Sequence, residues 1–312
     1  MDGDNLAVRG RIFDIRRFST HDGDGIRTTI FLKGCPLRCV WCQNPEGISE
    51  DEHLIHFENK YIRCGLCVKN CVNKSVIEKD NKISIIQEQC TEEQNKIVID
   101  VCPTGALTMD SKVYTLNEII EIVMRDRAFF KYGGGVTLSG GEPLFQKEFT
   151  IALLKKLKEI GINTAIETSL FAPSKYVLEI LPYIDIIFAD LKVFDEEKHK
   201  ALTGVSNELI KRNISLVLES DKKDNIIIRT PLIPEFTANK ENISDISSYI
   251  SKIYPNVRYE LLNYNPLAKA KYNLIDNLHY CFEENPRMYN DEQMKEFYDV
   301  AYSSGIKNLV IQ

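Results

Sequence analysis

Short apolar runs alternate with amphipathic stretches along most of the chain. An apolar run bounded by turn residues indicates a buried strand, whereas apolar positions at helical spacing indicate a helix packed on one face. The predicted strands are residues 27–34, 135–138, 164–167, 184–192, 226–229, 257–262 and 308–311. The predicted helices are residues 116–127, 153–160, 174–181, 197–202, 209–218, 243–254 and 291–301. This alternation is typical of a parallel sheet with right-handed crossovers.

About six strand–helix units fit an incomplete barrel better than a complete eightfold one. In that architecture the chemistry belongs at the carboxyl ends of the strands. Residues 52–110 break the pattern, because they are rich in cysteine and hold only short apolar pieces. We therefore expect residues 1–51 and 111–312 to build one α/β domain, with residues 52–110 as a small inserted α+β domain.

The composition of the 312 residues, 44% of them hydrophobic, is that of an ordinary globular enzyme. The net charge of -6 and the scattered basic residues argue against a nucleic-acid partner. Residues 1–10 do not resemble a signal peptide, and no run of 18 apolar residues indicates a membrane span. We expect a cytoplasmic monomer.

Cysteines are unusually frequent and unevenly placed. Eight of the nine lie between Cys35 and Cys102, and a reducing compartment disfavours disulfides, so their spacing indicates metal binding. Cys281 stands alone and is expected to be an incidental thiol.

The first cysteines form a C-x3-C-x2-C loop of Cys35, Cys39 and Cys42. Three thiolates can bind three irons of a [4Fe-4S] cluster, and without a fourth ligand one iron stays open to a small molecule. A structural zinc loop is the alternative, but zinc favours separated C-x2-C pairs. The loop therefore predicts a redox cluster with an open iron.

Residues 18–42, with Trp41 before the third cysteine, resemble the signature of glycyl-radical-enzyme activating enzymes. These belong to the radical S-adenosylmethionine family, and the pyruvate formate-lyase activating enzyme is one of them. Asp24 departs from the pattern, which usually has proline there. The resemblance implies an incomplete (β/α)6 TIM-like radical SAM barrel that binds S-adenosylmethionine at the open iron. It also implies cleavage of the cofactor to a 5′-deoxyadenosyl radical, which takes a hydrogen atom from a glycine of a partner enzyme.

A glycine-rich loop with Gly140, Gly141 and Glu142 follows a predicted strand. Two glycines allow the backbone to approach a ligand closely, although such a loop alone is more often a plain turn. By the resemblance, this loop binds the methionyl amino group of the cofactor.

Three polar residues, Thr168, Asp190 and Lys192, end the next two strands. Asp190 and Lys192 are two positions apart, so they point to the same side of a strand. Without further context, two such charged residues are most simply interpreted as a surface pair at the end of a strand. By the resemblance, Lys192 binds the cofactor carboxylate, and Asp190 helps form a monovalent-cation site with an acidic–threonine pair, here Glu167 and Thr168.

The remaining pocket residues come from the resemblance too. It assigns Arg229, at the end of another strand, to cofactor binding, and it puts Asn265 where some members have a histidine near the adenosyl group. Trp41 is expected near the adenine, and Gln43, which follows the third cysteine, is counted with this pocket.

The insert resembles an eroded two-cluster ferredoxin. Cys64, Cys67 and Cys71 match the last three positions of a C-x2-C-x2-C-x3-C-P run, and Tyr61 replaces the first cysteine. In the second run Cys102 is the last cysteine and Cys90 the first, whereas residues 95 and 98 are not cysteines. Two clusters cannot be made from these five cysteines. Either one cluster forms, on Cys64, Cys67 and Cys102 with Cys71 or Cys90 as fourth ligand, or none does.

The family uses flavodoxin or ferredoxin as electron donor, and its insert-bearing members lean toward glycyl-radical dehydratases, decarboxylases and C–N or C–S lyases. Two other functions remain open at this point. One is a radical S-adenosylmethionine enzyme acting on a small molecule. The other is an iron–sulfur electron carrier without catalysis of its own.

Overall fold

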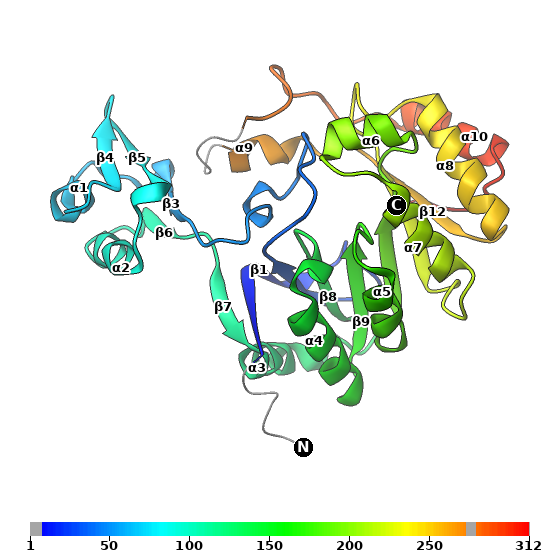
Figure 1. Cartoon of the computed structure of the whole chain (residues 1–312), viewed down its shortest axis with the longest axis horizontal. Helices are drawn as coiled ribbons and strands as arrows, with labels where there is room; N and C mark the ends of the chain where they lie inside the picture. Colours follow the sequence, from blue (N-terminus) through cyan, green and yellow to red (C-terminus); the bar gives the residue numbers. More distant parts are fainter. Residues whose placement is uncertain (1–7, 273–278, 312) are drawn as a thin grey trace.

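The computed structural model describes residues 8–272 and 279–311, and most of its strands form one large sheet (Figure 1). The sheet has nine strands in the order β13-β12-β11-β10-β9-β8-β2-β1-β7, and all neighbours from β2 to β13 are parallel. The parallel strands are β2 (Arg27–Leu32), β8 (Gly135–Gly140), β9 (Asn163–Thr168), β10 (Ile186–Asp190), β11 (Ile226–Pro231), β12 (Arg258–Leu262) and β13 (Asn308–Val310). All seven predicted strands are present, with ends shifted by a few residues.

Helices pack against this sheet and bury its apolar side chains. The core joins Ile119, Leu153 and Ile246 of three helices to Leu138 and Ile228 of two strands, all of them without exposed surface. The helices are α3 (Leu116–Asp126), α4 (Lys147–Glu159), α5 (Ser174–Ile180), α6 (Glu196–Thr203), α7 (Glu208–Leu218), α8 (Lys240–Ile253), α9 (Lys269–Tyr272) and α10 (Asp291–Ser303). Together they form the α/β architecture that the alternation predicts, and α9 is the one helix of this set that the sequence did not indicate.

Two antiparallel strands extend the sheet beyond β2 and were not predicted. They are β1 (Arg9–Ser19) and β7 (Lys112–Thr115), which pair with each other, and β1 also pairs with β2. Much of β1 is polar and only partly buried, so it lacks the apolar run that marks the central strands. Its pairing partners are far away in the sequence, and they determine its conformation.

The insert forms a separate unit with its own small core (Figure 1). Its elements are β3 (Leu54–His56), α1 (Leu66–Asn70), β4 (Val76–Lys79), β5 (Lys82–Ile85), α2 (Glu92–Asp100) and β6 (Leu107–Met109). β3 pairs with β6 and β4 with β5. Because β3 and β6 are the first and last strands, the chain enters and leaves the insert at one place. The order strand–helix–strand–strand–helix–strand matches the ferredoxin-like motif, and a ferredoxin-like identity stays a prediction.

Short 3-10 turns complete the described chain at residues 45–47, 58–60, 87–89, 127–129, 143–146, 181–183 and 266–268. None of the described helices combines the length and the apolar character that crossing a membrane would require.

Candidate functional site

The three cysteines of the C-x3-C-x2-C loop line one pocket of about 250 Å³ at the carboxyl ends of the parallel strands. The loop begins directly after β2, so Cys35, Cys39 and Cys42 lie where barrel chemistry is expected. Burial raises the pKa of Cys35 to about 12 and also raises the pKa of Cys39 and Cys42. Thiolates at these positions therefore need a positive partner, and iron supplies one.

A single metal ion does not suit this arrangement. No three His, Cys, Asp or Glu side chains of the described residues are positioned as ligands of one ion. A cubane cluster differs, because each thiolate binds a separate iron and the sulfurs need not converge on one point. The donor set of three partly buried thiols in one pocket fits such a cluster.

Backbone hydrogen bonds hold the cysteine loop in place. Gly34 N donates to Gly47 O over 2.9 Å, and Cys35 N donates to Ile48 O over 3.1 Å. On the other side, Arg38 N donates to the carbonyl of the last residue of α6 over 2.7 Å. The loop is thus fixed at both its start and its middle.

Gly140 and Gly141 bring the end of β8 against this loop. Gly141 N donates to Leu32 O over 2.8 Å. A Cβ atom on Gly141 would lie 2.4 Å from the carbonyl oxygens of both Gly34 and Gly47, which is far too close. The two glycines line the pocket, and their missing side chains permit the close contact between the two loops.

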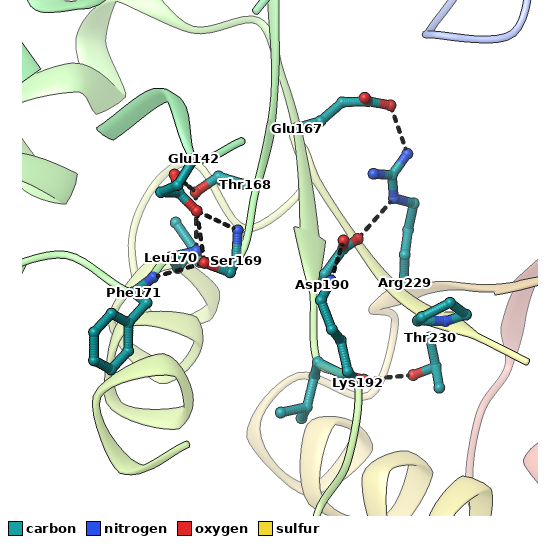
Figure 2. A network of polar contacts seen from close by, with 12 residues as sticks. Glu142, Glu167, Thr168, Ser169, Leu170, Phe171, Asp190, Lys192, Arg229 and Thr230 are labelled. Carbon is teal, nitrogen blue, oxygen red and sulfur yellow. Dashed lines mark hydrogen bonds and ion pairs between the residues drawn. The ribbon is translucent and has the colours of Figure 1, made fainter. Parts of the chain in front are cut away.

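Glu142 has a structural role that the sequence did not reveal. Its carboxylate accepts hydrogen bonds from Thr168 Oγ1 at 2.6 Å, from Ser169 N at 2.8 Å and Oγ at 2.6 Å, and from Leu144 N at 3.2 Å (Figure 2). The side chain is buried and does not line the pocket. Three of these four hydrogen bonds join the glycine-rich loop to the end of β9, and the fourth caps the turn that follows Glu142. Contact of this carboxylate with the cofactor stays a prediction.

Figure 2 also shows a second polar network, whose members Glu167, Asp190, Lys192 and Arg229 all line the pocket. Lys192 Nζ is 2.7 Å from Asp190 Oδ2, Arg229 Nε is 3.1 Å from Asp190 Oδ1, and Arg229 also reaches Glu167 Oε1 at 2.8 Å. Burial alone would raise the pKa of Asp190, but the two adjacent cations outweigh it and lower the pKa. Asp190 is thus an anion that orients a lysine and an arginine at the pocket wall.

A monovalent-cation site is not supported by this geometry. Glu167 is paired with Arg229 and accepts a hydrogen bond from Ser139, while the Thr168 hydroxyl donates to Glu142. A cation on the Glu167–Thr168 pair would have to displace an arginine.

Trp41 and Gln43 both line the pocket, whereas Asn265 does not. Trp41 is buried and packs against Phe236 with ring centroids 5.6 Å apart. Asn265 is exposed, and its side chain caps the following 3-10 turn by accepting from Leu267 N over 3.0 Å. Asn265 thus lies outside the pocket lining, and its place near the adenosyl group stays a prediction.

Several lining residues escaped the sequence analysis, among them Asn44 and Ser169. Asn44 is held by Lys271 Nζ at 2.7 Å, and Tyr272 Oη donates to Cys42 O over 3.0 Å, so α9 contacts the cysteine loop. Single polar residues outside a recognisable motif carry no signal in one sequence. Cys281 is partly buried beside the aromatic side chains around Trp41.

The five cysteines of the insert differ in what acts on them. The pKa of Cys67 is raised mainly by burial, and the charges of Cys102 and Cys64 add to this effect. Cys71 Sγ instead lies 3.3 Å from Ser75 Oγ and accepts from Val76 N over 3.1 Å, and Cys90 is adjacent to Cys71 and Ser75. Cys67 and Cys71 share the core of the insert, against which Cys90 and Cys102 pack, so the choice between Cys71 and Cys90 as fourth ligand stays open.

Comparisons with known proteins agree with this site. The model of the Radical SAM superfamily matches residues 29–245. The 4-hydroxyphenylacetate decarboxylase activating enzyme of Clostridioides difficile (strain CD196) is 37% identical over 96% of this chain and 95% of its own. The isethionate sulfite-lyase activating enzyme of Oleidesulfovibrio alaskensis is 36% identical over 88% of this chain and 89% of its own.

A solved structure of TYW1 with a lysine-pyruvate adduct bound superposes with a TM-score of 0.50 over 92% of this chain and 76% of that one. At 12% identity this likeness concerns the fold alone. The family match and the two relatives cover the cysteine loop and the strand ends of the pocket together. The chain therefore belongs to the radical SAM superfamily and, within it, to the activating enzymes of glycyl radical enzymes.

Proposed function

We propose that this enzyme cleaves S-adenosylmethionine reductively and uses the resulting radical to activate a partner glycyl radical enzyme. A [4Fe-4S] cluster on Cys35, Cys39 and Cys42 would supply one electron to the cofactor sulfonium. The S–C5′ bond then breaks into methionine and a 5′-deoxyadenosyl radical, which takes a hydrogen atom from a glycine Cα and becomes 5′-deoxyadenosine. The convergence of three thiols, two glycines and a lysine–aspartate–arginine network in one pocket supports this most.

The residues of the pocket would bind and orient the cofactor. Lys192 and Arg229 bring positive charge toward its carboxylate, and Asp190 fixes the directions of both cations. Backbone carbonyls of Gly140 and Gly141 are suited to accept from its amino group. Trp41 offers an aromatic surface for the adenine, and Gln43 and Thr168 line the same wall.

The partner is proposed to be a decarboxylase or lyase that carries its radical on glycine. This follows the names of the two relatives, one of which serves 4-hydroxyphenylacetate decarboxylase and the other isethionate sulfite-lyase. A flavodoxin or ferredoxin is the proposed electron donor to a cytoplasmic monomer. The ferredoxin-like insert is proposed to hold one further iron–sulfur cluster. The monovalent-cation site at Glu167 and Thr168 stays a prediction that the pocket geometry does not support.

The test compares Cys39→Ala with Cys281→Ala, both purified and reconstituted without oxygen. Cys39→Ala should abolish 5′-deoxyadenosine formation under reducing conditions, whereas Cys281→Ala should retain it. Retained cleavage in Cys39→Ala would contradict the proposal. Incubation of the wild type with candidate glycyl radical enzymes should give a glycyl radical signal in EPR. If cleavage occurs but no candidate acquires the radical, the alternative of a small-molecule substrate gains support.

A further inference from the structure

Three of the insert cysteines correspond to one site of a two-cluster ferredoxin. In the template the fourth cysteine of each run serves the other cluster, so Cys64, Cys67 and Cys102 belong to the same cluster. Cys71 and Cys90 would belong to the second cluster, whose other two positions are Asn95 and Val98. Val98 is completely buried in the insert core and cannot bind a metal. Only the first site retains a near-complete set of ligands.

The fourth corner of this first site is occupied by Tyr61. Its hydroxyl is buried and has no hydrogen-bond partner among the described residues. The thiols of Cys64 and Cys67 are close enough to contribute, after burial, to the rise in the pKa of Tyr61. A buried hydroxyl without a partner is costly, so something that the chain itself does not supply should pair with it.

His56 is a second group without a hydrogen-bond partner, and it lies beside Tyr61. Its side chain is only 9% exposed, and its Nε2 atom has no hydrogen-bond partner among the described residues. His56 is two residues from Leu54 on β3, so both side chains point toward the core that also contains Cys67. Its ring packs edge-on against Tyr61, with centroids 5.0 Å apart.

Two neighbours bear on the place of His56. Its Nδ1 atom lies 3.7 Å from the Glu58 carboxylate, which is a charge contact longer than a hydrogen bond. His56 is paired with Leu107 across β3 and β6, and the neighbouring Ala106 N donates to Cys102 Sγ over 3.2 Å. The histidine therefore lies next to the segment that positions the third cysteine.

We propose that the insert holds a single iron–sulfur cluster bound by Cys64, Cys67, Cys102 and the Nε2 atom of His56. In this arrangement the Tyr61 hydroxyl donates a hydrogen bond to a cluster sulfur. A neutral imidazole binds iron without losing a proton, whereas a phenol must lose one, which favours His56 over Tyr61 as the ligand. The His56 Nε2 atom and the Tyr61 hydroxyl then both have a binding partner. Cys71 and Cys90 take no part, and they remain a thiol pair around Ser75. This inference concerns a site separate from the S-adenosylmethionine pocket.

The test is made in a background without the first cluster. A full-length chain carrying Cys35→Ala, Cys39→Ala and Cys42→Ala is reconstituted anaerobically with ferrous iron and sulfide, and far-UV circular dichroism verifies its fold. It should bind about four irons and four sulfides per chain. Adding Cys64→Ala and Cys67→Ala should remove them, whereas the matched pair Cys71→Ala and Cys90→Ala should leave them.

The fourth ligand is tested in the same background. His56→Ala should lower the iron content to about three per chain and give the EPR signal of an oxidised three-iron cluster, and His56→Cys should restore about four. Tyr61→Phe should keep the iron content and shift the reduction potential. The proposal is overturned if the folded background protein binds no iron or binds zinc instead. It is also overturned if the Cys71/Cys90 variant loses its iron, or if the cluster is unchanged in His56→Ala. A failure here removes the proposed insert cluster but leaves the proposed cleavage of S-adenosylmethionine and activation of a partner intact, since these depend on Cys35, Cys39 and Cys42.

Discussion

The ammonium group of Lys33 lies 2.5 Å from the Oδ2 atom of Asp110, and both side chains are almost completely buried. Lys33 precedes Cys35 by two residues, and Asp110 is the first residue after the last strand of the insert. Asp110 Oδ1 also accepts from His53 N over 3.0 Å, at the entrance of the insert. One carboxylate thus joins both ends of the insert to the start of the cysteine loop.

We predict that Asp110→Asn destabilises the protein by about 3–5 kcal/mol, because it leaves the Lys33 charge buried without its partner. Thermal unfolding of the reconstituted enzyme measures this loss. Asp14→Asn is the matched control, since Asp14 forms an exposed pair with Arg16. Such a surface pair contributes less than about 1 kcal/mol. Equal effects of the two substitutions would contradict the structural role of Asp110.

The same pair predicts a pH dependence. Burial alone would raise the pKa of Asp110, but contacts with His53 and Lys33 outweigh it and lower the pKa below its usual value. A carboxyl group with a lowered pKa stabilises the fold above its usual pKa and loses this effect as the pH falls through the lowered value. The stability difference between wild type and Asp110→Asn should therefore be full at pH 7 and shrink below about pH 4. A difference that grows toward acid would refute this assignment.

Gly141→Ala should prevent assembly of the first cluster. The added Cβ would meet two backbone oxygens at 2.4 Å, so either the glycine-rich loop or the cysteine loop must move. Iron content and visible absorbance after reconstitution report the loss. Gly161→Ala is the control, because nothing lies near its Cβ and only its left-handed backbone is strained, at a cost of about 1–2 kcal/mol. The control should retain its iron.

Lys192→Met should weaken S-adenosylmethionine binding without loss of iron. The substitution removes the cation nearest to Asp190 but leaves Arg229 in place. The affinity should fall at least tenfold, which corresponds to about 1.4 kcal/mol, as measured by titration of the reduced cluster in EPR. Lys198→Met changes an exposed lysine on α6 and should bind normally. Iron loss in Lys192→Met would instead indicate a role in holding the loop.

Glu142→Gln separates a structural role from cofactor binding. Glutamine can accept at only one end of its side chain, so donors that now face the carboxylate lose their partner at a cost of about 1–3 kcal/mol. The melting temperature should fall, and the affinity of the folded protein for S-adenosylmethionine should change little. A large loss of affinity at unchanged stability would show that the carboxylate contacts the cofactor after all.

The sequence predicted much of the fold because the central strands are short apolar runs, and such runs can be recognised from the local sequence alone. It did not predict β1 and β7, since their polar residues become strands only through pairing with distant segments. The short helix α9 was missed for a similar reason: its contacts are with the cysteine loop, more than 200 residues away.

By itself the sequence determined the spacing of three cysteines on one loop, and this spacing predicts a cluster with one open iron. It also located the strand ends that carry Asp190, Lys192 and Arg229. Only the tertiary structure decided what each polar group contacts. It turned Glu142 toward Thr168 and Ser169, left Asn265 outside the pocket lining, and placed Cys71 against Ser75. Side-chain partners that are distant in sequence are set by packing, and no local pattern encodes them.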